Sequence, residues 1–163
     1  MPGHSYRPGL VIGVDVRPAQ LAEIIALRHR ELRPGFPRAD AVFEGDDEPA
    51  TRHFGAFLAA TGENVACASF MARPFALRGH PLDGRPGYQL RGMATRSDLV
   101  AQGIGRALLA YAERALDERS GRLLLWCNAR SGAAAFYAKV GWSIVSPEFD
   151  IPTVGPHYTM LRR

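Results

Sequence analysis

The feature that most constrains this chain is a strand-loop-helix signal between Leu90 and Leu109. The sequence LRGMATRSDLVAQGIGRALL predicts the end of a strand, a short loop, and a glycine pair entering an amphipathic helix. The first N–H groups of a helix have no partners within it, and the helix dipole places partial positive charge there. Glycines carry no Cβ that would keep an anion away. The sequence therefore predicts a diphosphate-binding turn, formed by Gln102, Gly103, Ile104, Gly105 and Arg106.

A Gly-x-Gly pair before a helix is a weak signal alone, because many such pairs only make a tight turn. No Gly-Lys-Ser/Thr follows, which excludes a Walker loop, and Leu108 occupies the third glycine position of the dinucleotide fingerprint. A nucleotide-phosphate hydrolase is disfavoured because neither the lysine nor a metal-binding carboxylate follows the loop. The identity of the anion has to come from the rest of the chain.

Length, composition and charge are ordinary for a globular protein, and the mild positive balance could favour a polyanionic small ligand. The 163 residues predict a single domain, residues 1–163, with a sizeable core. The net charge of +4 is mild and the arginines are scattered, so no nucleic-acid partner is expected. No apolar run reaches the ~20 residues of a membrane span, and no signal-peptide core begins the sequence, so we expect a cytoplasmic protein. Cys67 and Cys127 each fall in a predicted strand and suggest neither a disulfide nor a metal site.

The first half of the chain predicts a strand, a helix and a β-hairpin. We expect a strand at residues 10–16 and a helix that starts around Asp15 and Pro18. Its inner face is predicted by helical spacing and consists of Leu21, Ile24, Ile25, Arg28 and Leu32. A polar loop at 35–50, strands at 53–60 and 65–72, and a second loop at 73–87 follow.

The second half predicts alternating strands and helices. A strand at 88–94 leads through the glycine pair into a helix that ends at Gly121, and a buried strand follows at 123–127. Ser131 is expected to cap a short helix that runs to residue 140, before strands at 142–145 and 157–161 separated by a loop at 147–156. Strand, helix and strand in succession indicate a right-handed crossover between parallel strands. The fold class is therefore α+β with a mixed sheet.

With this order of elements, the chain resembles the GCN5-related N-acetyltransferase (GNAT) family. The acetyl-CoA loop of that family, Gln/Arg-x-x-Gly-x-Gly/Ala, is similar to Val100-Ala-Gln-Gly103-Ile-Gly105. Val100 departs from the pattern at its first position. A later family motif resembles the stretch from Asn128 to Trp142, in which Phe136-Tyr137 precedes Gly141. The N-terminal helix with its acidic loop, and the ending GPHYTM, resemble a bacterial subgroup of largely unassigned substrate.

The resemblance implies a mixed sheet of six to seven strands in which two parallel strands splay apart and hold CoA. It implies direct attack of an amine on acetyl-CoA, with no metal, and family members are often homodimers. The pantetheine arm would pair with the strand edge formed by Met93, Ala94 and Thr95, where a backbone N–H could polarise the thioester carbonyl. Asn128 would orient CoA or the helix start, and Tyr137 would protonate the leaving thiolate. Without the motif, Tyr137 would be interpreted as a packed aromatic residue and Asn128 as part of a turn.

The amine has to be neutral to attack, so a base is also expected. The sequence offers Glu44, Asp46, Asp47, His53 and His157, and does not rank them. The acidic residues could instead form a solvated loop, or a collar of negative charge that attracts a cationic amine. A non-catalytic module that binds or senses acyl-CoA is the alternative function. The acceptor could be a polyamine, an amino acid, an aminoglycoside or a peptide.

Overall fold

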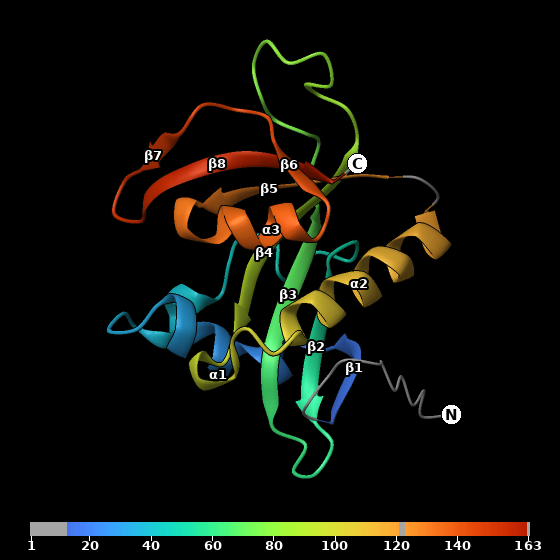
Figure 1. Cartoon of the computed structure of the whole chain (residues 1–163), viewed down its shortest axis with the longest axis vertical. Coiled ribbons are helices and arrows are strands. Elements are labelled where there is room, and N and C mark those ends of the chain that lie inside the picture. The colour runs from blue at the N-terminus through green and yellow to red at the C-terminus, as the bar shows by residue number, and fades with distance from the viewer. Residues whose placement is uncertain (1–12, 121–122, 163) are drawn as a thin grey trace. The chain divides into compact units, whose positions relative to one another are not determined.

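The computed structural model describes residues 13–120 and 123–162, which form one mixed sheet and three α-helices. The elements, in chain order, are β1 Val14–Ala19, α1 Leu21–Leu32, β2 Arg52–Leu58, β3 Asn64–Ala72, β4 Gly87–Thr95, α2 Ile104–Ser120, β5 Leu124–Arg130, α3 Ala134–Lys139, β6 Trp142–Ile144, β7 Phe149–Ile151 and β8 Gly155–Arg162 (Figure 1). The strand order is β1-β2-β3-β4-β5-β8-β6, and β7 pairs with β8. The pairing of β4 with β5 is parallel, whereas β1–β2 and β5–β8 are antiparallel. The α+β class and the mixed sheet are thus confirmed, with eight strands.

The chain divides into two compact units. Unit 1 comprises residues 1–69 and 92–119, and unit 2 comprises residues 70–91 and 120–163. Strands β3 and β4 contribute residues to both units. The predicted diphosphate turn belongs to unit 1, and Asn128 and Tyr137 belong to unit 2.

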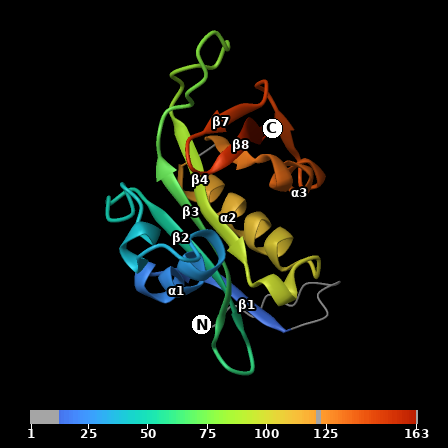
Figure 2. The ribbon, with the colours of Figure 1, turned by 90° about the vertical axis from the view of Figure 1, so that its left-hand side faces the viewer.

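In unit 1, α1 and α2 cover opposite faces of the strands (Figure 2). Ile24 and Leu27 of α1 pack in one buried cluster with Cys67 of β3 and Ala94 of β4. On the other face, Tyr111 of α2 meets the ring of Phe54 of β2 edge-on, at 6.0 Å between centroids. This arrangement confirms the inner face predicted for α1, where Ile24, Ile25 and Arg28 are buried.

In unit 2, α3 covers one face of β5 and the segment between β3 and β4 covers the other. The Tyr137 ring of α3 lies 5.7 Å from that of Trp142. On the opposite face, Phe75 lies 5.7 Å from Trp126 of β5, and Trp126 Nε1 donates to the Arg73 carbonyl at 3.1 Å. Since side chains alternate along a strand, Asn128 shares the face of Trp126.

The predicted start of α1 was wrong. Pro18 lies in β1, opposite Phe54 of β2, and the helix begins at Leu21. β1 is an edge strand, where the missing proline N–H is tolerated. The actual start is fixed by Glu23, whose carboxylate accepts from the Gln20 N–H at 2.7 Å. Residues 10–12 of the predicted first strand lie outside the described residues.

Two predictions near the C-terminus were also wrong. The predicted loop at 147–156 contains β7, because Phe149–Ile151 pair with the start of a β8 that is longer than predicted. Ser131 does not cap α3, which begins at Ala134; its hydroxyl donates to Glu148 at 3.1 Å instead. The helix end predicted at Gly121 lies outside the described residues.

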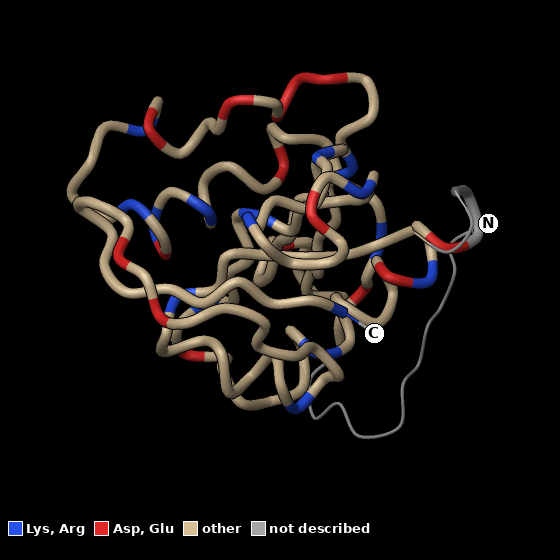
Figure 3. The backbone as a smooth tube through the Cα atoms, turned by 90° about the horizontal axis from the view of Figure 1, so that it is seen from above, with Lys and Arg blue, Asp and Glu red and all other residues tan. Residues whose placement is uncertain are grey.

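Charged residues of both signs are interspersed along the described chain (Figure 3). Within residues 13–120 and 123–162, no group of three His, Cys, Asp or Glu side chains gathers as metal ligands would. None of the helices there is both long and apolar enough to cross a membrane.

Candidate functional site

The glycine-containing turn lies immediately before α2, as predicted. Gly103 has φ +83°, a left-handed conformation that glycine adopts without strain, and its carbonyl accepts from the Ala107 N–H at 3.0 Å. Ile104, Gly105 and Arg106 therefore form the first turn, and their N–H groups have no acceptor inside the helix. Arg106 is exposed. α2 is 17 residues long, so its positive dipole end is fully developed at this turn.

The predicted strand edge, Met93 to Thr95, directly follows Gly92, whose φ of +61° lies in the left-handed region of backbone conformation. Met93 and Thr95 are half-buried and Ala94 is buried, at the end of β4. The parallel register of β4 with β5 runs from Gly87 opposite Leu124 to Leu90 opposite Cys127. The predicted edge therefore lies beyond the residues of β4 that are registered with β5.

A fully buried ion pair in unit 1 involves one of the predicted base candidates. Arg28 Nη1 donates to Asp46 Oδ2 at 2.6 Å, and Nη2 donates to Asp46 Oδ1 at 3.1 Å. The Phe43 N–H also donates to Asp46 Oδ2, at 2.6 Å, and Arg28 Nη1 donates to the Ala41 carbonyl at 2.9 Å. Both oxygens of Asp46 are thus committed, and this carboxylate holds the acidic loop against α1.

His53 extends this network to β2 and β3. Ser69 Oγ accepts from Arg28 Nη2 at 2.7 Å and lies 2.6 Å from His53 Nδ1. His53 Nε2 lies 2.9 Å from the Asp46 carbonyl, which can only accept. A neutral imidazole with its proton on Nε2 satisfies every partner, because Ser69 then donates to Nδ1. Both ring nitrogens are therefore engaged.

The other two acidic candidates face solvent. Glu44 and Asp47 are exposed on the loop between α1 and β2. The structure thus separates the three acidic base candidates of this loop into one structural carboxylate, Asp46, and two accessible ones, Glu44 and Asp47.

Tyr137 lies on the α3 face of unit 2 among aromatic rings. Its ring is 5.3 Å from Phe136 and 5.7 Å from Trp142. Burial, and secondarily the neighbouring Cys127, raise the pKa of the phenol far above its ordinary value. Burial also raises the pKa of the Cys127 thiol to about 12. Both groups therefore stay protonated at neutral pH.

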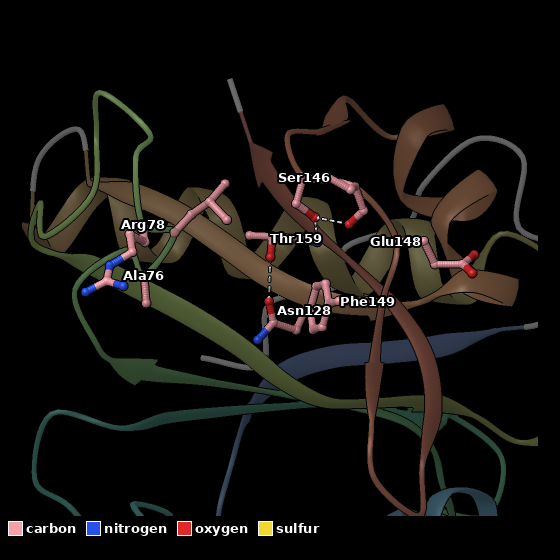
Figure 4. Close-up of a pocket in the computed structure, with 9 residues that line it drawn as sticks. Ala76, Arg78, Asn128, Ser146, Glu148, Phe149 and Thr159 are labelled. Carbon is pink, nitrogen blue, oxygen red and sulfur yellow. Dashed lines mark hydrogen bonds between the residues drawn. The ribbon is translucent and has the colours of Figure 1, made fainter.

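Asn128 lies on the opposite face of β5, in a hollow of about 400 Å³ (Figure 4). Its Oδ1 accepts from the Thr159 hydroxyl at 3.0 Å, across the β5–β8 ladder. The other lining residues come from the segment after β3 and from the β6–β7 connection; they are Ala76, Leu77, Arg78, Ser146, Pro147, Glu148 and Phe149. Asn128 is thus a residue of β5 itself, not of a turn that follows the strand.

His157, the remaining base candidate, is buried beside this hollow. It lies two residues before Thr159 on β8 and so shares its face. Its ring stacks on Phe149 with 6.1 Å between centroids, and Nδ1 donates to the Gly155 carbonyl at 2.7 Å. In the neutral ring Nε2 then carries a lone pair.

Sequence reasoning did not assign a site role to Arg28, Ser69, Arg78 or Glu148. Arg28 did give a signal, since a charged residue fell on the predicted apolar face of α1. Ser69, Arg78 and Glu148 gave none, because each meets its neighbours only through tertiary contacts.

Comparison with known proteins identifies the family and the fold. The acetyltransferase (GNAT) domain family matches residues 52–144. The uncharacterized N-acetyltransferase YitI of Bacillus subtilis (strain 168) is 33% identical over 149 residues, which cover 91% of this chain and 95% of YitI. Escherichia coli ElaA has a similar structure, with a TM-score of 0.73, 16% identity, and coverage of 92% of this chain and 99% of ElaA. An acyl-CoA N-acyltransferase from Pseudomonas aeruginosa gives a TM-score of 0.67 at 19% identity, covering 91% of this chain and 99% of that one.

Proposed function

Because this chain belongs to the GNAT family and therefore transfers an acetyl group from acetyl-CoA to an amine, we propose how its own residues carry out that transfer. The amine attacks the thioester carbonyl directly, and CoA leaves as a thiolate. The observation that carries the assignment is the turn at Gly103, which ends in free N–H groups at the start of a 17-residue helix.

The diphosphate of CoA is proposed to bind at the first turn of α2. N–H groups of Gly103, Ile104, Gly105 and Arg106 donate to its oxygens, and the exposed Arg106 guanidinium adds a full positive charge. Gln102 contributes its amide at the edge of the turn. Val100, where the family motif has a polar residue, is 56% exposed and contributes no hydrogen bond from its side chain.

The pantetheine arm is proposed to pair with Met93, Ala94 and Thr95. An amide chain can add to a strand edge as another strand would. The position of these residues beyond Leu90, the last β4 residue registered with β5, supports the assignment. A backbone N–H of Met93 or Ala94 stabilises the negative charge that develops on the thioester oxygen.

Tyr137 is proposed to assist the leaving thiolate, with Asn128 orienting CoA through one of its two amide N–H groups. An exposed tyrosine, with a pKa near ~10, would almost balance a thiol near ~8.5. The raised pKa of Tyr137 makes full proton transfer less favourable than the sequence suggested. Tyr137 is therefore better described as a hydrogen-bond donor to the thiolate, whose final proton comes from solvent.

Among the five base candidates, we propose His157 as the base. Asp46 and both nitrogens of His53 are engaged in the buried network. Glu44 and Asp47 are exposed carboxylates, which supports a role in attracting the amine. His157 combines burial with a ring nitrogen that accepts a proton, next to Phe149 of the hollow.

Thiol release from acetyl-CoA, measured with a panel of amines, tests the proposal. Tyr137→Phe should lower kcat by about 10²-fold, because the donor to the leaving group is lost, and should leave CoA affinity unchanged. Tyr88→Phe is the matched control and should keep full turnover. Turnover of Tyr137→Phe equal to wild type would remove Tyr137 from the mechanism.

We also propose that residues 1–163 act as one acetyltransferase domain. The family match at 52–144 includes residues of both compact units, which supports this assignment. A non-catalytic acyl-CoA sensor would bind acetyl-CoA and release no thiol with any amine. The Val100 departure is the one sequence feature that favours that alternative.

A further inference from the structure

We propose that the hollow around Asn128 binds the acceptor, and that Arg78 selects amines that carry an anionic group, with a carboxylate as the preferred one. The proposal rests on the acetyltransferase function proposed above, and it names the class of acceptor for that function. It follows from the size of the hollow, its hydrogen-bonding groups and its charges.

The size of the hollow suits a small acceptor. Its volume of about 400 Å³ lies near the lower end of ordinary ligand pockets, roughly 300–1,000 Å³. It lies on the face of β5 that Trp126 and Asn128 share, whereas Cys127 and Tyr137 lie on the other face. An acceptor bound here would approach the strand from the face opposite the proposed thiolate donor.

The hydrogen bonds around the hollow leave mainly donors for a ligand. The Ser146 hydroxyl donates to the Pro147 carbonyl at 2.8 Å and accepts from the Thr159 N–H at 2.8 Å. The Thr159 hydroxyl donates to Asn128 Oδ1, so the Asn128 amide keeps two N–H donors, one for the CoA contact proposed above and one to face the acceptor. Arg78 adds a guanidinium, with five further N–H donors. Such a set complements a ligand rich in oxygen acceptors.

The two charged residues of the hollow, Arg78 and Glu148, differ in whether their polar atoms already have partners in the protein. No described residue forms an ion pair or a hydrogen bond with the exposed Arg78 side chain. Glu148 accepts from the Ser131 hydroxyl and from Tyr158, whose pKa it raises. Arg78 is therefore the charged group whose hydrogen-bond donors are still open to a ligand, whereas Glu148 keeps its negative charge but is already hydrogen-bonded. Figure 4 shows Arg78 and Glu148 toward opposite ends, with Asn128, Thr159 and Phe149 between them.

A zwitterionic amine complements this arrangement. Its carboxylate would meet the Arg78 guanidinium, whose fork matches two carboxylate oxygens. Its ammonium would lie toward the Phe149 ring and Glu148, which favour a cation, before deprotonation by His157. A polyamine would fit worse, because filling the hollow would place a second ammonium beside Arg78.

The test compares matched acceptors on the purified full chain. Steady-state thiol release from acetyl-CoA is measured for L-α-amino acids and for the corresponding L-α-amino acid amides. Wild type should give a kcat/KM about 10- to 100-fold higher for the acids, the range expected for one charge-assisted hydrogen-bonded contact. Amidation also lowers the pKa of the amine, so nucleophile availability alone would favour the amides.

Arg78→Gln should remove this preference by raising KM for the acids while leaving the amides unchanged. Arg78→Lys keeps the charge without the fork and should give an intermediate preference. Arg85→Gln is the matched control, since Arg85 is an exposed arginine of the same segment that does not line the hollow, and it should keep the wild-type preference. O-phosphoethanolamine against ethanolamine forms a second arm, which shows whether a phosphate serves in place of the carboxylate.

Several outcomes would overturn the proposal. A preference that survives Arg78→Gln excludes Arg78 as the selecting group, and so does a wild type that prefers neither the acids over their amides nor O-phosphoethanolamine over ethanolamine; in both cases thiol release still upholds the acetyltransferase function. If O-phosphoethanolamine is preferred over ethanolamine but the acids are not preferred over their amides, the carboxylate preference is wrong. Phosphate is then the anionic group that Arg78 selects. If no amine releases thiol although CoA binds, the proposed function itself fails, and the acceptor assignment fails with it. Equal melting temperatures of the variants show that the exposed substitutions leave the fold intact.

Discussion

Arg28 has a dense set of polar contacts within unit 1. Its side chain is fully buried, pairs with Asp46, donates to Ser69 and lies over the Phe43 ring at 4.4 Å. A buried guanidinium is costly unless its partners are well placed, and here they come from two segments, the loop between α1 and β2 and strand β3. Among the described groups, only Arg28 Nε and Asn64 Oδ1 are buried side-chain atoms with no partner.

Asp46→Asn should destabilise the protein strongly, because it leaves the Arg28 charge buried without its counter-ion. The free energy of unfolding in urea should fall by about 3–5 kcal/mol. Glu63→Gln, which breaks the exposed ion pair with Arg96, is the control and should change stability little. A stable Asp46→Asn variant would show that the network is dispensable, and Asp46 would return as a base candidate.

The raised pKa of Tyr137 predicts the shape of the pH–rate profile. A raised phenol pKa favours the protonated donor, so Tyr137 remains competent above the pH at which an exposed tyrosine, with a pKa near ~10, would ionise. Measured kcat should therefore rise with pH as the amine loses its proton, and then stay level through about pH 10.5. A falling limb near pH 10 in wild type that is absent in Tyr137→Phe would contradict this expectation. Spontaneous thioester hydrolysis is subtracted at each pH.

Among individual residues, the sequence predicted those whose partners lie close by in the chain. It missed those whose partners are distant in the sequence and come into contact only in the folded protein. The turn at Gly103 could be predicted because its glycines and helix lie within a few residues of one another. The Arg28 network could not, because Asp46 and Ser69 lie 18 and 41 residues away along the chain. Asp46 and His53 looked like free bases for the same reason.

Strand β4 connects the buried Arg28 network with the proposed pantetheine edge, because Gly92 lies against Arg28 and directly precedes Met93. Gly92 has φ +61°, one residue before Met93, and the Cys67 thiol donates to its carbonyl at 3.4 Å. A Cβ at Gly92 would lie 2.8 Å from Arg28 Nε and 3.0 Å from the Phe43 ring. Glycine is therefore required here both by the backbone conformation and by the close approach of α1.

Gly92→Ala should lower the free energy of unfolding by about 1–3 kcal/mol, because alanine is strained at this φ and its methyl group meets Arg28. It should also weaken acetyl-CoA binding, since Met93 and Ala94 follow directly. Gly132→Ala is the control, because a Cβ there meets nothing within 4 Å. Urea unfolding and a CoA titration of both variants measure the two effects. Unaltered stability in Gly92→Ala would show that β4 relaxes freely around this position.

Hydrophobic periodicity predicted the helices and strands with strong patterns. It did not predict the elements whose existence or bounds depend on pairing between strands. The buried run of β5 and the amphipathic faces of α1 and α2 repeat over many residues, so they could be read directly. β7 has only three residues and forms because β8 extends back to Gly155 and pairs with it. The start of α1 moved to Leu21 because β1 pairs with β2 through Ala19, which no local propensity specifies.

For the whole molecule, the order of the two sequence motifs, Val100–Gly105 and Asn128–Trp142, indicated the family, whereas the amino-acid composition did not. The proposed acetyl-CoA loop belongs to unit 1, and the Asn128–Tyr137 region belongs to unit 2. Residues proposed to handle the acceptor occur in each unit. Unit 1 presents the exposed Glu44 and Asp47, and unit 2 presents the hollow with Arg78.

Isothermal titration of acetyl-CoA into the purified full chain tests the central claim most directly, because every proposed role depends on the diphosphate binding at the first turn of α2. We expect saturable binding at one site per chain, with a Kd on the order of 1 µM to 1 mM, the usual range of enzyme KM values. Binding should weaken steeply with added salt and when Gly103 is replaced by valine, which blocks the turn. The absence of any binding heat with millimolar acetyl-CoA would contradict the account.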